Sequence, residues 1–388
     1  MTLPLRQPYP PMEAKSVDTI PAGPEWQYEP KWDGFRCLAF RDGDTVALQS
    51  KAGEPLARYF PEMVEAVGKV AAKKFVLDGE IVIPRGSALS FDDLLMRIHP
   101  AESRVRKLAT ETPALLIVFD LLVDERGTSL VEKTLEERRR RLETFAARYL
   151  KGHPRISLSP CTDDPRMAMR WFEATRGALD GVIAKRRDVP YRSGDRTGMQ
   201  KFKQRRTADC VVGGFRYASA GGAIGSLLLG LYDDEGLLHH VGFTSSMSAP
   251  DRKALVPKLE ALVKEPGFTG NAPGGPSRWS TERSAEWKPL QSKLVAEVEY
   301  DHVSGGRFRH GTRFVRWRPD KAPRQCTFDQ IERAEGSMLR LLGVGAGITS
   351  RSKRAMGPKR STEPKRTTRL KGAASTATKR TTKEGRRA

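Results

Sequence analysis

Short apolar runs rich in β-branched residues recur along the chain, and they limit its folding more than any other feature. Residues 74–84 (KFVLDGEIVIP) and 114–122 (ALLIVFDLL) are typical of buried strands. Two alternating runs around an Asp-Gly-Asp turn predict a β-hairpin over 35–53. Helical spacing of apolar residues predicts helices over 135–150 and 164–177. Together these segments indicate an α+β fold with antiparallel sheets.

The pattern changes near residues 205–212, which we take as a domain boundary. Beyond it, five short strand-like runs and one helix over 249–265 predict a small β-barrel of the OB type. After about residue 346 large apolar residues become rare, which predicts disorder. We therefore expect a first domain over 1–205, an OB-fold domain over 206–345 and a disordered basic tail over 346–388.

The charge balance favours a polyanionic partner. The 388 residues carry a formal net charge of +21. Fourteen Lys and Arg residues lie in 351–388 against only Glu363 and Glu384, so this tail contributes +12 and the preceding residues keep +9. Because the body is basic without its tail, nucleic acid is the natural partner, and the tail is expected to contact backbone phosphates without sequence preference. A solvated tail without function is the alternative.

Nothing in the sequence indicates a membrane or an oxidising compartment. No stretch approaches the roughly 20 apolar residues of a membrane span, and the N-terminus lacks the apolar segment of a secretory signal. The four cysteines are far apart and form no C-x-x-C pair, which argues against a zinc ribbon. We expect a cytoplasmic, nucleoid-associated monomer with free thiols. The Pro-rich residues 1–24 are expected to wrap the surface without forming an element.

The segment EPKWDGFR (29–36) raises the question of what Lys31 does. Lys31 stands beside a proline and just before an Asp-Gly turn, so it is either a surface charge on a hairpin or a nucleophile held in a pocket. An amine attacks only when it is unprotonated, and burial or neighbouring cations can lower its pKa. Lys185, Lys201 and Lys203 could supply such cations, or they could be solvated charges at strand edges.

Two acidic residues stand in or beside apolar strands and need partners there. Glu80 lies inside the run 74–84, and Asp180 precedes the run GVIAKR. A buried carboxylate is stabilised either by a salt bridge or by a hard cation such as Mg²⁺ bound together with nucleotide phosphates. Both readings stay open at this point.

Six blocks in a fixed order resemble the covalent nucleotidyltransferase superfamily, which contains ATP-dependent DNA ligases, RNA ligases and mRNA capping enzymes. The blocks are KWDGFR at 31, LDGEIVI at 77, VFDLL at 118, LDGVIAKR at 179, KFK at 201 and RWRPDK at 316. The flanking stretches, including TADCVVGGFRY and EVEYDHVSGGRFRHGTRFVRWRPDKAP, look like the bacterial ATP-dependent DNA ligases of the ligase C type.

The resemblance implies an adenylation domain followed by an OB domain, and a role for each matching residue. Lys31 matches the lysine that takes AMP from ATP as a phosphoramidate. Lys185 and Lys201 match the lysines that hold the α-phosphate. The residues that match nucleotide contacts are Glu29 (adenine, through its backbone), Arg36 (ribose and nick phosphate), Lys51, Glu80 (ribose or metal), Phe119 (adenine stacking) and Lys203. Arg316, Arg318, Asp320 and Lys321 match a block that orients the leaving pyrophosphate, which implies a mobile joint near residues 205–210.

The sequence departs from the family pattern at three positions. Asp180 stands where a glutamate is common, so a metal contact there would run through water. Lys51 stands where an arginine is common, which removes a bidentate option. Met199 replaces a tryptophan. None of these changes removes a charge of the required sign.

The resemblance implies sealing of nicks in duplex DNA with ATP and Mg²⁺, or Mn²⁺ in its place, in DNA repair, with end-joining or repair proteins as possible partners. An RNA ligase or capping-type enzyme is the first alternative. A non-catalytic nucleic-acid-binding OB protein is the second, although binding alone needs no ordered nucleophile and carboxylates.

Overall fold

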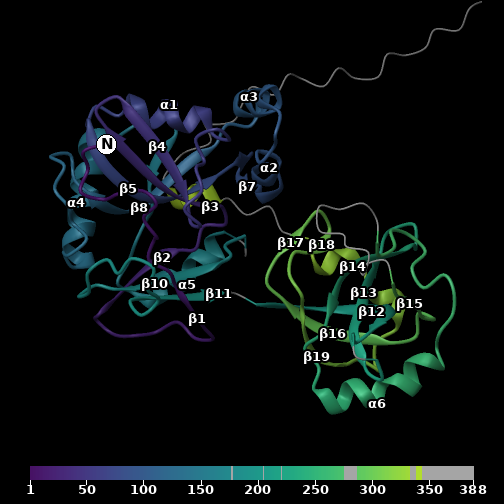
Figure 1. The fold of residues 1–388 in the computed structure, drawn as a ribbon. Coiled ribbons are helices and arrows are strands. Elements are labelled where there is room, and N and C mark those ends of the chain that lie inside the picture. Colours follow the sequence, from purple (N-terminus) through teal and green to yellow (C-terminus); the bar gives the residue numbers. More distant parts are fainter. Residues whose placement is uncertain (176–177, 204, 220, 275–285, 333–337, 343–388) are drawn as a thin grey trace, which may run out of the picture. The chain divides into compact units, whose positions relative to one another are not determined.

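The computed structural model describes residues 1–175, 178–203, 205–219, 221–274, 286–332 and 338–342 (Figure 1). We call residues 1–203 the N-terminal portion and residues 205–332 the C-terminal portion. Strands of each portion pair only with one another among the described residues. No helix within the described ranges is long and apolar enough to cross a membrane.

The described residues of the N-terminal portion form eleven strands and five helices. They are β1 (Lys15–Val17), β2 (Trp26–Pro30), β3 (Phe35–Asp42), β4 (Thr45–Ser50), α1 (Pro61–Lys69), β5 (Lys74–Val82), β6 (Pro84–Arg85), β7 (Ala88–Leu89), α2 (Phe91–Met96), α3 (Glu102–Glu111), β8 (Leu115–Val123), α4 (Leu135–Tyr149), β9 (Ile156–Leu158), α5 (Pro165–Ala174), β10 (Gly181–Arg186) and β11 (Met199–Lys203).

Two mainly antiparallel sheets organise this portion. The first has the order β4-β3-β5-β8-β9, and the second has the order β1-β11-β10-β2. The predicted hairpin is confirmed as β3 and β4, with Asp42 opposite Thr45. The predicted strands 74–84 and 114–122 correspond to β5 and β8, and every residue of β8 is buried. The expectation that residues 1–24 form no element is wrong, because β1 pairs in parallel with β11.

The predicted helices begin where capping residues stand. The Thr134 side chain accepts a hydrogen bond from the backbone N–H of Glu137 at the start of α4. Asp164 caps α5, and Pro165 occupies the first turn, where a missing N–H costs nothing. Leu142 and Phe145 of α4 are buried against the core of the first sheet, which fixes the helix beside β8 (Figure 1).

The C-terminal portion contains β12 (Arg206–Tyr217), β13 (Ile224–Tyr232), β14 (Leu238–Thr244), α6 (Ala249–Glu260), β15 (Lys288–Pro289), β16 (Val295–Tyr300), β17 (Val303–Ser304), β18 (Arg307–Phe308), β19 (Arg313–Trp317), η1 (Pro323–Gln325) and η2 (Phe328–Gln330). The main sheet runs β14-β13-β12-β16-β19, with β15 also on β12. The described strands form an OB-like sheet whose path does not close, so the predicted barrel is confirmed in its OB character but not as a closed ring.

A short 3₁₀ helix, η3 (Met338–Leu342), follows the C-terminal portion. Its Met338 and Leu339 are buried in the same apolar cluster as Trp32 and Trp171 of the N-terminal portion. The predicted boundary near residue 205 agrees with the separate strand pairing but stays a prediction. The predicted disordered tail lies outside the described residues.

Candidate active site

A cleft of about 240 Å³ is lined by side chains from both sheets of the N-terminal portion. Eight residues predicted for the site line it: Glu29, Lys31, Arg36, Lys51, Glu80, Phe119, Lys185 and Lys201. Five of the eight are cationic, so the cleft suits a ligand that carries several negative charges. The prediction that these residues, which are far apart in the sequence, lie close together is therefore confirmed for these eight side chains.

Eight further lining residues were outside the sequence prediction: Pro11, Met12, Glu13, Ala14, Pro30, Trp32, Ile183 and Met199. Four of them come from the N-terminal segment, which carries no periodic pattern and gave no signal for a site. Pro11 and Met12 are buried and Glu13 and Ala14 are half-buried, so this segment forms one wall of the cleft.

Lys31 follows directly on β2 and is fixed by its neighbours. Its backbone N–H donates to the carbonyl of Gly181 at 2.9 Å, and the Trp32 indole donates to the Ser159 hydroxyl at 2.9 Å. A Cβ on Gly34 would collide with the carbonyl oxygen of Ile81, so only glycine allows β3 to approach β5 this closely. These contacts anchor the backbone on both sides of the Lys31 side chain.

The Lys31 ammonium forms an ion pair with the Asp180 carboxylate. Burial alone would lower the pKa of Lys31, but Asp180 outweighs it and raises this pKa above its ordinary value. Burial likewise acts to raise the pKa of Asp180, yet hydrogen bonds from His302 and Lys31 hold it well below its usual range. The Asp180 carboxylate therefore favours the charged form of Lys31, and an amine in this form must lose a proton before it can attack.

Arg36 and Glu80 lie opposite each other on β3 and β5. The Arg36 guanidinium does not pair with Glu80 but with the fully buried Asp78, at 2.5 and 2.6 Å. Among the described residues, no hydrogen bond or ion pair engages the Glu80 carboxylate. Burial raises the pKa of Glu80 to about 7, against the opposing charges of Arg36 and Lys31.

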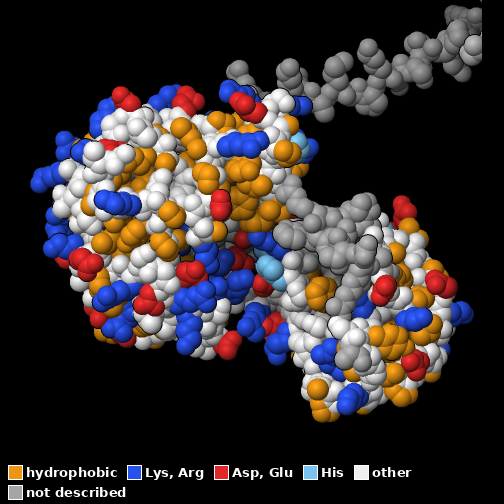
Figure 2. All heavy atoms as spheres, in the orientation of Figure 1, with side chains coloured by type: hydrophobic (Ala, Val, Ile, Leu, Met, Phe, Trp, Pro, Cys, Tyr) orange, Lys and Arg blue, Asp and Glu red, His pale blue; other side chains and the backbone are white. Residues whose placement is uncertain are grey.

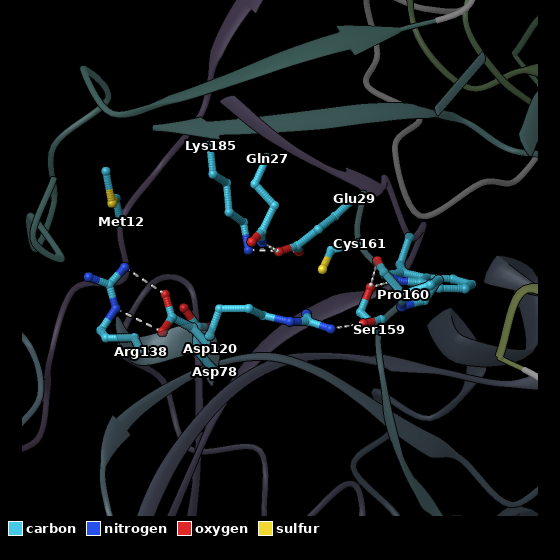
Figure 3. Close-up of polar contacts among 12 residues, drawn as sticks. Met12, Gln27, Glu29, Asp78, Asp120, Arg138, Ser159, Pro160, Cys161 and Lys185 are labelled. Atoms are coloured by element: carbon cyan, nitrogen blue, oxygen red, sulfur yellow. Dashed lines mark hydrogen bonds and ion pairs between the residues drawn. The ribbon is translucent and has the colours of Figure 1, made fainter. Parts of the chain in front are cut away.

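Lys185 of β10 lies opposite Gln27 of β2 and diagonal to Glu29 on the same strand (Figure 3). The Lys185 ammonium donates to the Glu29 carboxylate at 2.7 Å, and Gln27 donates to the other oxygen at 2.8 Å. The Phe119 ring lies 4.5 Å from the Lys185 ammonium and 4.5 Å from the Arg36 guanidinium carbon. An aromatic face in the cleft suits a nucleobase.

Lys201 is a cation of the cleft without a hydrogen bond or ion pair among the described residues. Its pKa is lowered by burial first and then by the charges of Lys203 and Lys31. Lys203 was predicted to lie close by, but it does not line the cleft and pairs with Asp301 at 2.7 Å. Lys51 pairs with Glu13 at the rim at 3.0 Å.

The four residues predicted to orient pyrophosphate lie on β19 and just after it. Arg318 and Lys321 both donate to Asp209 at 2.9 Å, and Arg318 also pairs with Asp320 at 2.8 Å. Arg316 pairs with Glu297 at 2.6 Å. None of the four lines the cleft, so the structure does not bring them together with Lys31. Asp180 also lies outside the lining and reaches the site through Lys31.

A search for known relatives defines the class of protein. The family model described as "ATP dependent DNA ligase domain" matches residues 11–203, and "ATP dependent DNA ligase C terminal region" matches residues 220–321. This chain belongs to the ATP-dependent DNA ligase family.

DNA ligases of the C type are similar to this chain over most of its length. The chain is 45% identical over 345 residues to DNA ligase C1 of Mycolicibacterium smegmatis, covering 86% of this chain and 96% of the relative. It is 43% identical over 350 residues to DNA ligase C of Mycobacterium tuberculosis, with the same coverage of both chains. A solved structure from a study of Lig E DNA ligases matches 80% of this chain and 99% of its own, with TM-score 0.50 and 16% identity, and supports the fold alone.

Proposed function

We propose that this ATP-dependent ligase seals nicks in duplex DNA through AMP bound covalently to Lys31. The observation that carries the proposal is the position of Lys31 in a cleft with four other cations and an aromatic face. In the first step the Lys31 amine forms an N–P bond to the α-phosphate of ATP, the bond to the β-phosphate breaks, and pyrophosphate leaves. AMP then passes to the 5′-phosphate at the nick, and the 3′-hydroxyl displaces it.

The cations would stabilise the negative charge that develops on the transferred phosphoryl group. Lys185 and Lys201 are proposed to hold the α-phosphate, because they enter the cleft from adjacent strands, β10 and β11. Phe119 would stack on adenine beside Glu29, and Arg36 with Lys51 would contact the sugar-phosphate part. Asp180 is a poor proton acceptor because its pKa is held low, so its effect on Lys31 is electrostatic.

The carboxylates around Lys31 fit a magnesium ion that binds together with ATP. Mg²⁺ is commonly held by one or two carboxylates and by substrate phosphates. Glu80 offers an unpaired carboxylate in the cleft, and Asp180 lies beside Lys31. No group of three or more metal-binding side chains occurs in the described part of the chain, which agrees with a site completed by the nucleotide. When bound, the ion would neutralise charge on the phosphates; Mn²⁺ could serve in its place.

The block of Arg316, Arg318, Asp320 and Lys321 is proposed to orient pyrophosphate during the first step only. Because these residues do not line the cleft, this role requires a movement about residues 205–210, between an adenylation domain (1–205) and an OB domain (206–345). We propose a cytoplasmic monomer that acts near the nucleoid in repair, with end-joining or repair proteins as partners.

The basic surface supports DNA as the second substrate. Lys and Arg side chains gather over the part of the N-terminal portion where β10 and β11 lie (Figure 2). Non-specific contacts with phosphates account for much of the affinity of DNA-binding proteins. The basic tail over 346–388, which lies outside the described residues, is proposed to add such contacts without a part in the chemistry.

A labelled-ATP experiment tests the proposal. Protein incubated with α-labelled ATP should carry an acid-labile adduct on a denaturing gel, GTP should give none, and Lys31→Ala should abolish it while the surface variant Lys69→Ala retains it. Nicked duplexes with the four combinations of DNA and RNA strands, each with Mg²⁺ or Mn²⁺, then identify the substrate. No adduct favours the non-catalytic alternative. Preference for RNA at both sides of the nick favours the RNA ligase alternative.

A further inference from the structure

Arg36 is held in the cleft by a residue that does not line it. Both its Nε and one Nη donate to the Asp78 carboxylate, and the Asp78 side chain is fully buried. A bidentate pair of this kind fixes the plane of the guanidinium as well as its position. The remaining face of Arg36 lies against Phe119, at 4.5 Å from the ring centre.

Asp78 in turn is oriented by Tyr191, from the loop between β10 and β11. The Tyr191 hydroxyl donates to the second oxygen of Asp78 at 2.7 Å and accepts a hydrogen bond from the backbone N–H of Met12 at 2.9 Å. Both hydrogen-bonding capacities of this hydroxyl are thus used. Burial raises the pKa of Tyr191 well above its usual value, which keeps the hydroxyl neutral and able to donate.

The Tyr191 ring itself is firmly placed. It is 5% exposed, it stacks on Tyr9 with ring centres 6.3 Å apart, and the Arg138 guanidinium lies 5.5 Å from its centre. Arg138 is held by Asp120, and Figure 3 shows this pair beside Asp78 and Met12. A rigid ring places the hydroxyl at the junction of two walls of the cleft.

We infer that Tyr191 is a positioning residue for nucleotide binding, whose hydroxyl couples the N-terminal wall at Met12 to Arg36 through Asp78. This inference rests on the proposed function, in which Arg36 contacts the sugar-phosphate part of ATP. Neither Tyr191 nor Asp78 lines the cleft, so both act through other residues. The arrangement also directs Arg36 away from Glu80, its partner in strand register, and leaves that carboxylate unpaired.

Removal of the Tyr191 hydroxyl should weaken ATP binding more than it slows the adenylation of Lys31. In Tyr191→Phe the buried N–H of Met12 loses its acceptor and Asp78 loses one donor. We expect the Kd for ATP to rise about five- to thirtyfold, while the maximal single-turnover rate of Lys31 adenylation changes less than threefold. The matched control is Tyr9→Phe, which removes the hydroxyl of the stacked neighbour, hydrogen-bonded to Ser193 instead.

A double-mutant cycle separates positioning from general stability. If Tyr191 acts through Arg36, Tyr191→Phe should add less than twofold to the loss of ATP affinity already caused by Arg36→Ala. Full additivity, or equal behaviour of Tyr191→Phe and Tyr9→Phe, would overturn the inference. If Tyr191→Phe does not fold, Asp78→Asn must show the same effect on Kd rather than on rate, or the inference fails. A wild-type protein that forms no lysyl adduct refutes the proposed function instead.

Discussion

The ion pair between Lys31 and Asp180 makes a quantitative prediction about the protonation of the nucleophile. Two unit charges 4 Å apart at an effective dielectric constant of about 20 attract each other by about 4 kcal/mol. In Asp180→Asn this attraction is lost, whereas the burial that lowers the pKa of Lys31 remains. The pKa of Lys31 should therefore fall when the Asp180 carboxylate is removed.

Competitive labelling with acetic anhydride measures this pKa without catalysis. The free protein, without nucleotide or metal, is labelled across pH 6 to 11, and the acetylated fraction of each lysine is read by mass spectrometry. Lys31 is accessible, with 19% of its side chain exposed. Lys201 serves as an internal control in the wild type, since its pKa is lowered and it should react at lower pH than Lys31.

A matched control variant is Asp188→Asn, which removes a surface carboxylate bonded to Arg186. It should leave the labelling midpoint of Lys31 unchanged. A midpoint that moves by less than one pH unit in Asp180→Asn would refute the view that this carboxylate sets the protonation state of the nucleophile.

Three further predictions concern adenine stacking, the first step and stability. Phe119→Leu should raise the KM for ATP about five- to thirtyfold through lost stacking, with Phe119→Tyr close to wild type in initial-rate assays. Arg318→Ala should slow adduct formation at least about a hundredfold, yet leave the sealing of a pre-adenylated nick nearly unchanged; equal losses in both assays contradict a first-step role. Burial, with Arg307 and Arg216, lowers the pKa of His240 to about 3, so stability is lost as pH falls below the unfolded value of about 6.5. Between pH 7 and pH 5 the free energy of unfolding, measured with urea, should fall by about 2 kcal/mol more in the wild type than in His240→Gln. If the free energy of unfolding depends on pH in the same way in both proteins, the prediction is wrong.

The sequence could predict which side chains meet in the cleft, because these side chains belong to short motifs in or beside apolar strands. Lys31, Glu80 and Lys185 each stand in or beside an apolar run, and sheet formation brings these runs together. The motifs could not predict which acidic side chain pairs with which basic one. Whether Arg36 bonds to Glu80 or to Asp78 depends on the side chains that reach β5 from elsewhere, and Tyr191 lies 113 residues further along the chain.

The N-terminal wall escaped prediction for a related reason. Residues 11–14 have no periodicity, since their side chains pack into a cluster assembled from distant strands and not onto one face of a regular element. Their only local signal is proline content, which equally suits a surface strand. The position of Arg318 outside the cleft could not be predicted from its motif either. A motif indicates which residues are proposed to act together, but not the conformation in which they meet.

The charge pairs of the cleft explain how several buried cations can coexist before ATP arrives. Lys31, Arg36 and Lys185 are each held by a separate buried carboxylate: Asp180, Asp78 and Glu29. A buried cation without such a partner would be expensive and would lose its proton. Lys201 is half-buried and has no such partner among the described residues, and burial together with the charges of Lys203 and Lys31 lowers its pKa. ATP binding would therefore give Lys201 the counter-charge that it lacks, whereas Lys31 must give up the carboxylate that keeps it protonated. Under the proposed function, the cleft would thus favour phosphate binding at Lys201 and keep Lys31 charged until ATP is bound.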